Sequence, residues 1–336
     1  MNIELFSMKS FSSSTSNYAA TGIIVVAVTL ALASVWNDSI IVDEDPHIGA
    51  GYSYMAKQDM RLNPEHPPLA KDVAALPLLF LNLDDSVFAT KFWQTDVNDQ
   101  WEFGRRLIFN SGNDADLIAR VVKIAMMIFF VIAGWLIFRW TRERYGDKAG
   151  LLALTLFAFS PTVMAHARFV TTDIAALAGV LAATYIFVRY LKNPTRNNFW
   201  LATVVFGLAL LTKFSTILLV PFFILLALIW NWKTIGRTLL LLLLGFIVVV
   251  GPVYYFHTLN YPPTRQLADT KQLLGTYSNR LFADPVVWAS DKPILRTYAQ
   301  YGLGLLMVVQ RSEGGNTVYY RGEVLKAAGA GYFPFV

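Results

Sequence analysis

The chain has 336 residues, of which 55% are hydrophobic and only 15% are charged. Soluble domains carry about 25% charged residues, so this composition excludes an ordinary soluble protein and a disordered one. The sequence contains no cysteine, which excludes a disulfide framework, a thiolate zinc site and a cysteine nucleophile. The mean hydropathy of +0.45 points instead to a protein that lies in a bilayer.

Seven apolar stretches are candidates for membrane-spanning helices. A hydrocarbon core about 30 Å thick requires roughly 20 apolar residues, because each helical residue rises about 1.5 Å. The stretches are 18–36, 118–138, 149–166, 172–188, 198–212, 214–232 and 238–258. The first is interpreted as a retained anchor, because its apolar run is longer than the core of a signal peptide. The sequence therefore predicts an all-α polytopic membrane protein with about seven transmembrane helices.

The short loops between these stretches alternate in charge. One set holds Arg139, Arg142, Arg144, Lys148, Arg189, Lys192, Arg196, Lys233 and Arg237, whereas the alternate set holds Arg168 and Lys213. Basic loops remain in the cytoplasm, so we expect the tail 1–17 there and the segments 38–116 and 259–336 outside. The net charge of +5 thus reflects topology, and nucleic-acid binding is not expected.

The segment 38–116 combines charge with short apolar runs. It holds 14 of the 23 acidic residues. The run Val73–Leu83 is too short to span a bilayer and predicts an interfacial helix, and Tyr301–Gln310 predicts a second interfacial or re-entrant run. A structural anchor needs no such concentration of titratable groups, so we expect chemistry on the outer side.

The first candidate motif follows the first predicted span and contains Asp43, Glu44, Asp45 and His47. Three adjacent carboxylates repel one another, which raises the pKa of at least one of them. A carboxylate at this position could act as a general base toward an acceptor hydroxyl. The alternative is a solvated loop that caps the end of a helix.

The second motif, Asn63–Lys71, contains three prolines and His66. The prolines hold His66 in an extended backbone just before a helix. The free N–H groups at that helix start favour a phosphate, with Lys71 on the first turns. The alternative is a turn that simply begins a helix.

The third motif, His166–Asp173, links two predicted spans on the outer side. Asp173 stands at the start of a helix, where a negative charge is favourable. An ionisable residue at a span boundary is commonly functional, but it can also serve only as a cap. Arg168 could pair with Asp173 or bind an anion.

Further cations lie at Lys213 and in the tail. Lys213 stands where two spans meet, and it either snorkels to lipid headgroups or points into a cavity. The tail carries Arg265, Arg280, Arg311, Arg321 and Lys326. Guanidinium groups suit bidentate phosphate recognition, although scattered surface arginines are commoner.

The ordered set of these motifs resembles the GT-C glycosyltransferases. The motifs are Asp43-Glu44 with His47, His66–Lys71, Ala167–Phe169 with Asp173, and Gly207–Lys213. Within that group the chain is most similar to the protein O-mannosyltransferase branch in its bacterial phospholipid-carrier-dependent form. The stretch Gly302–Val336 is similar to the part of the family that enters a further membrane helix, so we expect a C-terminally truncated chain.

The resemblance implies a GT-C transmembrane domain over 18–258, with the external loop 38–116, and an external segment over 259–336. It implies an inverting enzyme that moves a mannose-like sugar from a polyprenyl-phosphate carrier to a hydroxyl of a protein Ser/Thr, a lipid or a glycan. The reaction would take place on the extracytoplasmic side of a bacterial plasma membrane. Some family members form dimers, and a homodimer is therefore left open.

The resemblance also implies roles for individual residues. The catalytic group is Asp43 as base, Glu44 as its partner, and Asp173. The groups implied to meet the donor and its phosphate are His66, Lys71, Arg168 and Lys213, to which the cationic tail adds Arg265 and Arg321. No ligand spacing demands a metal, so no cofactor is assigned. A divalent cation held by Asp43, His47 and His66 is left as an alternative.

Two other classes of protein compete with a glycosyltransferase. A flippase or transporter for a lipid-linked sugar would place ionisable groups near the membrane midplane, often on inverted repeats. Here the predicted spans are almost free of charge inside and no repeat is evident. The other alternative is an inactive membrane scaffold, which the expected truncation favours.

Overall fold

A computed structural model describes residues 13–315 and 317–335 of the chain. These residues are mainly helical, and their strands are a single antiparallel hairpin, β1 (Val318–Tyr320) with β2 (Glu323–Leu325). The prediction of an all-α polytopic membrane fold is confirmed.

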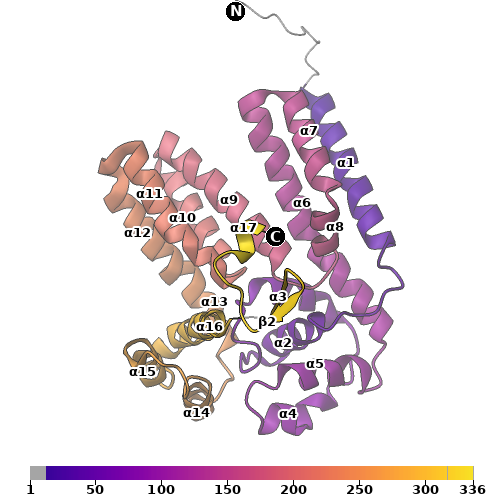
Figure 1. Cartoon of the computed structure of the whole chain (residues 1–336), viewed down its shortest axis with the longest axis vertical. Coiled ribbons are helices and arrows are strands. Elements are labelled where there is room, and N and C mark those ends of the chain that lie inside the picture. The colour runs from indigo at the N-terminus through magenta and orange to yellow at the C-terminus, as the bar shows by residue number, and fades with distance from the viewer. Residues whose placement is uncertain (1–12, 316, 336) are drawn as a thin grey trace, which may run out of the picture.

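One group of long helices contains the N-terminal span. It consists of α1 (Ser13–Ala33), α6 (Ala115–Tyr145), α7 (Asp147–Ala158) and α8 (Pro161–Ala167), which lie together in Figure 1. The chain bends by 63° between α7 and α8. Proline at the start of α8 fits there because its missing N–H would have no partner in a first turn.

The second group runs alongside the first through the contact of α6 with α9. Its elements are α9 (Asp173–Lys192), α10 (Arg196–Leu210), η3 (Phe214–Leu218), α11 (Leu219–Asn231), η4 (Trp232–Thr234), α12 (Ile235–Gly245), the π-helical turn η5 (Phe246–Val250) and α13 (Gly251–His257). Helices α10 and α12 approach closely at two glycines. A Cβ on Gly207 would lie 2.6 Å from the carbonyl oxygen of Gly245, so a larger residue would push the helices apart.

The number of helices that qualify as spans differs from the predicted seven. By length and composition four described helices could cross a membrane, or five with the bent pair α7 and α8. Helix α10 has only 15 residues, fewer than the roughly 20 that a span requires. Residues 214–257 form one candidate membrane span of 44 residues. Within it the chain turns at η4, so that α11 and α12 lie side by side (Figure 1). The seven apolar stretches are therefore helical, but they are not seven complete spans by this measure.

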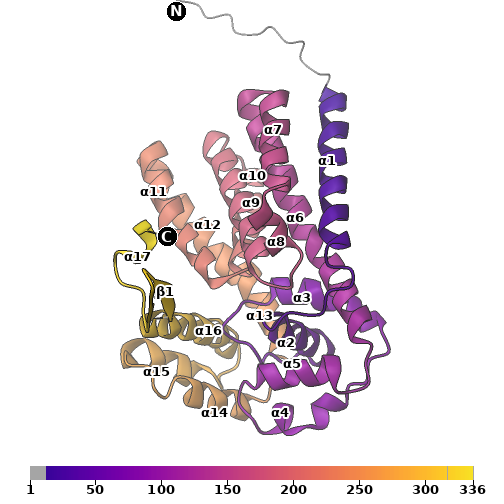
Figure 2. The ribbon, with the colours of Figure 1, turned by 45° about the vertical axis from the view of Figure 1, so that its right-hand side comes forward.

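The first external loop forms a layer of short helices beneath the bundle (Figure 2). They are α2 (Glu44–Lys57), α3 (Leu69–Ala75), η1 (Leu76–Phe80), η2 (Ser86–Ala89), α4 (Lys91–Gln94) and α5 (Gln100–Phe109). The run Val73–Leu83 is not one helix, because it divides into the end of α3, the 3-10 turn η1 and an extended end. Leu79 and Phe80 remain exposed on η1, as an interfacial position requires.

The C-terminal residues extend this layer. They form α14 (Pro263–Leu273), α15 (Arg280–Ala289), α16 (Leu295–Gly314), the hairpin and α17 (Tyr332–Phe335). The run Tyr301–Gln310, predicted as interfacial or re-entrant, lies inside the 20-residue helix α16, which packs against α13 and α15.

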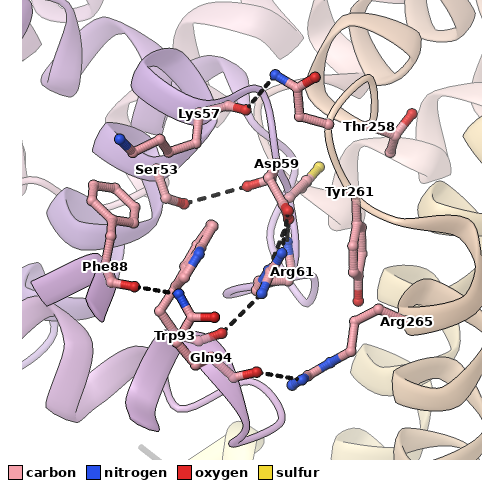
Figure 3. Close-up of polar contacts among 12 residues, drawn as sticks. Ser53, Lys57, Asp59, Arg61, Phe88, Trp93, Gln94, Thr258, Tyr261 and Arg265 are labelled. Carbon is pink, nitrogen blue, oxygen red and sulfur yellow. Dashed lines mark hydrogen bonds and ion pairs between the residues drawn. The ribbon is translucent and has the colours of Figure 1, made fainter. Parts of the chain in front are cut away.

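Arg265 joins the external loop to the C-terminal layer, and Arg61 braces the neighbouring part of the loop (Figure 3). Arg61 forms an ion pair with buried Asp59 at 2.5 Å and donates to the carbonyl oxygen of Trp93 at 2.8 Å. Arg265, on α14, pairs with Asp269 at 2.7 Å and donates to the carbonyl oxygen of Gln94 at 2.8 Å. These contacts fix α4 against α14 and so hold the layer in one arrangement.

Candidate active site

A cavity of about 240 Å³ lies where the external layer meets the bundle. Its chemically active lining residues are Asp43, His47, Glu65, His66, Asp173, Lys213 and Arg311. They come from the start of α2, the loop before α3, the start of α9, the segment after α10, and α16. Segments that are more than 250 residues apart in the sequence thus share one polar cavity.

Asp43 lies directly before α2 with its side chain exposed to the cavity. It occupies the N-cap position, but its carboxylate accepts no cap hydrogen bond. It also forms no ion pair with any described residue. A carboxylate in this state is free to accept a proton from a ligand.

Glu44 has a different environment although it is the next residue. It is fully buried and accepts hydrogen bonds from the backbone N–H groups of Ile41 at 2.9 Å and Val170 at 2.8 Å. The Lys123 ammonium lies 3.9 Å away. Burial raises the pKa of the Glu44 carboxyl, and these partners oppose that shift. Glu44 is outside the cavity lining and joins the Asp43 segment to the loop before Asp173.

The predicted effect of carboxylate crowding falls on Asp45, whereas the pKa of Glu44 is raised by burial and by no neighbouring carboxylate. Burial, and then the neighbouring Glu44, raise the pKa of Asp45 to about 6, while Arg105 lowers it. One carboxylate oxygen of Asp45 is buried without a hydrogen-bond partner. Helix α5 presses on this residue, because a Cβ on Gly104 would lie 2.1 Å from the Asp45 carbonyl oxygen.

Two histidines face each other in the cavity wall. The ring centroids of His47 and His66 are 4.9 Å apart in an edge-on arrangement. Burial, followed by the nearby cations Lys71, Lys213 and Arg311, lowers the pKa of His66 to about 3, and the pKa of His47 is also well below its usual value. Both rings are therefore neutral at pH 7, and the buried Nδ1 of His47 has no partner.

Lys71 positions the His66 loop from behind and does not line the cavity. Its ammonium is completely buried and donates to the carbonyl oxygens of His66 at 2.7 Å and Asn63 at 2.8 Å, and to the Tyr54 hydroxyl at 2.8 Å. Burial lowers the pKa of Lys71 to about 7. The position on the first turns of α3 is as predicted, but the side chain turns away from the space that a donor would enter.

Asp173 and Lys213 form an ion pair across the cavity wall. The Lys213 ammonium lies 2.6 Å from the Asp173 carboxylate, and His166 Nδ1 lies 4.0 Å from the same group. A backbone hydrogen bond of 3.0 Å from Leu69 N–H to Leu211 C=O joins the start of α3 to the end of α10. This bond places Lys213 beside the His66 loop, and the lysine lines the cavity.

Arg311 is a cavity residue that the sequence motifs did not single out. It lines this cavity and an adjoining one of about 160 Å³ that also touches Glu65 and His66. No described carboxylate lies within ion-pair distance of its guanidinium. Helix α16 reaches this position because Gly304 packs on the Pro64 carbonyl oxygen, where a Cβ would come within 2.0 Å. The sequence signal was only a cationic tail.

Glu65 is the second cavity residue that the sequence did not indicate as part of the site, although it directly precedes His66. Its carboxylate accepts hydrogen bonds from the side-chain amides of Gln100 and Asn98, the latter at 3.3 Å. Gln100 also accepts from the Asn63 amide. These contacts attach the loop to the start of α5, so Glu65 is held in place at the cavity edge.

Three arginines that were predicted to bind the sugar donor do not line the cavity. Arg168 donates to the Ser34 hydroxyl at 3.0 Å and stacks on Phe169. Arg265 belongs to the contacts in Figure 3 that brace α14. Arg321 has a positive φ of 53° in the turn between β1 and β2. The geometry does not bring these arginines to the other site residues.

The residues of the alternative cation site lie around the same cavity. Asp43, His47 and His66 all line the cavity. Nevertheless, across the described parts of the chain no three His, Asp or Glu side chains are grouped closely enough to hold a metal ion. The cation set that the sequence left open is therefore not assembled.

The lining can support proton transfer and anion binding in one space. Asp43 offers an acceptor for a proton, and Lys213 and Arg311 offer positive charge. The neutral histidines can donate or accept hydrogen bonds without adding charge. A hydroxyl nucleophile and a phosphorylated leaving group could therefore be handled together.

Residues 115–256 match a family model described as dolichyl-phosphate-mannose-protein mannosyltransferase. Searches of curated proteins and of solved structures gave no match. The matched segment contains Asp173 and Lys213, while Asp43, His66 and Arg311 lie outside it. With several helices apolar enough to cross a membrane, the chain is an integral membrane protein. The match supports a glycosyltransferase of the mannosyltransferase type and confirms the resemblance to the protein O-mannosyltransferase branch of the GT-C glycosyltransferases.

Proposed function

We propose that the cavity catalyses inverting transfer of a mannose-like sugar from a polyprenyl-phosphate carrier to an acceptor hydroxyl on the extracytoplasmic side. The acceptor would be a protein Ser/Thr, a lipid or a glycan. One observation carries the proposal: the free carboxylate of Asp43 shares a polar cavity with Lys213 and Arg311.

Asp43 would act as the general base. Its carboxylate would take the proton of the acceptor hydroxyl while that oxygen forms a bond to the anomeric carbon of the sugar. The bond from this carbon to the phosphate oxygen would break on the opposite side, and the configuration at the carbon would invert. The absence of any cap hydrogen bond to Asp43 supports this role, because no bond within the protein must be lost first.

Lys213 and Arg311 would hold the phosphate that leaves. Negative charge grows on this group in the transition state, and preorganised cations stabilise it most strongly there. Asp173 would position the Lys213 ammonium through their 2.6 Å contact. Arg311 could bind two phosphate oxygens at once.

His47 and His66 would hydrogen-bond the sugar hydroxyls as neutral rings. Their low pKa values support this function, because a positive ring would compete with Lys213 for the phosphate. Glu44 and Lys71, buried behind the wall, would act only as positioning residues.

The test is a transfer assay with polyprenyl-phosphate mannose and membranes that contain the full chain. Asp43→Asn should reduce kcat by about 100-fold to 10,000-fold, the usual contribution of a general base. Asp38→Asn is the matched control, since this acid of the same loop is outside the cavity lining. Normal transfer by a folded Asp43→Asn variant would remove Asp43 from its proposed role.

A further inference from the structure

A second polar cavity, of about 330 Å³, lies between the C-terminal parts of α6 and α9. Its lining includes Trp140 and Arg144 from α6 and Tyr185, Arg189 and Lys192 from α9. None of these residues belongs to the candidate active site, and the proposed reaction does not use them.

The cavity has an excess of positive charge. Glu143 is its one acidic lining residue, and this carboxylate is already engaged by Arg139 at 3.1 Å and by the Tyr185 hydroxyl at 2.7 Å. Over the residues that the structure describes, Arg144, Arg189 and Lys192 have no carboxylate within ion-pair distance. The Tyr185 contact also joins α9 to α6 and keeps the cavity walls together.

The length of helix α9 gives the distance across the membrane between this cavity and the candidate active site. It begins at Asp173, in that site, and ends at Lys192, at the second cavity. Twenty helical residues span about 30 Å, which is the thickness of the hydrocarbon core. The two cavities therefore lie at opposite headgroup layers, and Trp140 and Tyr185 are the aromatic residue types enriched there. Figure 2 shows α6 and α9 running together between these ends.

A second space adjoins the basic cavity, and its lining combines apolar Ile137, Trp140 and Leu181 with polar Thr141, Arg144 and Tyr145. This adjoining space, of about 370 Å³, shares Trp140 and Arg144 with the basic cavity and also touches Ile137 and Leu181. Ile137 precedes Arg144 by two helical turns, and Leu181 precedes Arg189 by about the same distance along α9. A ligand with a charged head and an apolar tail would fit both spaces.

We propose that these two spaces bind an anionic phospholipid, with its headgroup phosphate on Arg144, Arg189 and Lys192. Guanidinium groups bind phosphate oxygens in pairs, and basic pockets between membrane helices recognise anionic headgroups. Snorkelling alone would send the three side chains to separate headgroups. Here two packed helices direct them to one concave space beside a second, partly apolar space. The phosphate is that of a lipid, because a free phosphate would leave the apolar side chains of Ile137 and Leu181 unused.

The experiment measures lipid binding by the purified full chain in a neutral detergent. Phosphatidylglycerol and phosphatidylcholine are added in turn, and retained lipid is measured by mass spectrometry together with the shift in Tm. The variant is Arg189→Gln with Lys192→Gln. The matched control is Arg196→Gln with Lys233→Gln, because these exposed cations lie at the same end of the bundle but outside both spaces.

We expect the native chain and the control to retain phosphatidylglycerol over phosphatidylcholine, and the cavity variant to bind it about tenfold or more weakly, in line with the loss of two headgroup cations. Equal retention by the cavity variant and the control would overturn the proposal. Equal stabilisation by inorganic phosphate at the same concentration would overturn the assignment to a lipid. If the double variant does not fold, Arg144→Gln, on the other helix, gives the same comparison.

Discussion

The two ends of α9 hold cations in different ways. At the Asp173 end, Lys213 is paired and the surrounding loops are fixed by the buried charges of Glu44 and Lys71. At the Lys192 end, the cations are exposed and Glu143 is their single acidic neighbour in the cavity. Glu44 and Lys71 are buried and fix the loops around the half-exposed Asp173–Lys213 pair, and fixed positions are what a transition state requires. The exposed cations at the Lys192 end can adjust to a mobile headgroup. The difference suggests that catalysis belongs to the first end and lipid contact to the second.

Among the cations at the two ends of α9, the largest effect on transfer should come from removing Lys213, which we propose holds the leaving phosphate. Lys213→Met should reduce transfer by about 100-fold to 1,000-fold, the range seen when one preorganised charge-stabilising group is lost. Arg168→Gln is the matched control, because this cation lies outside the cavity lining. The measurement is kcat/KM with a polyprenyl-phosphate sugar. Equal losses in both variants would show that general surface charge, and not the cavity, matters.

A large effect on stability should follow from Glu44→Ala. The substitution leaves the N–H groups of Ile41 and Val170 without their acceptor and leaves Lys123 buried without a carboxylate. Breaking a buried pair of this kind costs about 3–5 kcal/mol, to be read from thermal or denaturant unfolding in detergent. Glu102→Ala, at an exposed ion pair, should cost less than about 1 kcal/mol. Similar costs for the two would contradict the positioning role of Glu44.

A moderate effect should appear as a loss of stability in acid. The pKa of His66 falls from 6.5 to about 3 on folding, so the unfolded chain binds more protons between these values. Stability should then decrease as pH falls below about 6.5, by up to about 1.4 kcal/mol per pH unit for each such group. Asp45, whose pKa rises to about 6, acts in the opposite direction below pH 6.

The test of this pH effect compares Tm at pH 7 and pH 5 for the native chain and His66→Gln. The variant should show a weaker decrease, because one neutral buried ring has been removed. Lys71, Lys213, Arg311 and Asp173 act on the ring and are kept in both proteins. An unchanged decrease would assign the pH dependence to other groups.

The smallest effect on catalysis should come from substitutions at the Lys192 end of α9. Arg189→Gln with Lys192→Gln should alter kcat by less than about twofold in a lipid mixture that keeps the chain folded, because these residues are about 30 Å from Asp173 along α9. The transfer assay measures this directly. A large decrease in kcat with unchanged stability would mean that the two ends of the helix are coupled.

Much of the fold and part of the site could be predicted from local sequence. Long apolar runs specify helices whatever surrounds them. Asp43, Asp173 and Lys213 stood out because they lie near the ends of such runs, and His66 because prolines hold it just before a helix. Helix count was less certain, because a 15-residue helix such as α10 satisfies hydropathy without satisfying length.

The rest depended on tertiary packing. Arg311 reaches the cavity only because Gly304 allows α16 to rest on Pro64, and no local pattern contains that contact. Lys71 and Arg265 were chosen for their charge, yet burial and carbonyl partners give them structural positions. Residue type and spacing do not reveal toward which neighbour a long side chain will turn.

The measurement that tests the central claim most directly uses the lack of cysteine in the chain. Asp43→Cys, Arg311→Cys and Arg168→Cys each provide one labelling site for a water-soluble maleimide. We expect a polyprenyl-phosphate sugar to slow labelling at positions 43 and 311 and to leave the labelling rate at position 168 unchanged. If the donor is bound and labelling at positions 43 and 311 is unchanged, Asp43 and Arg311 do not contact the same substrate.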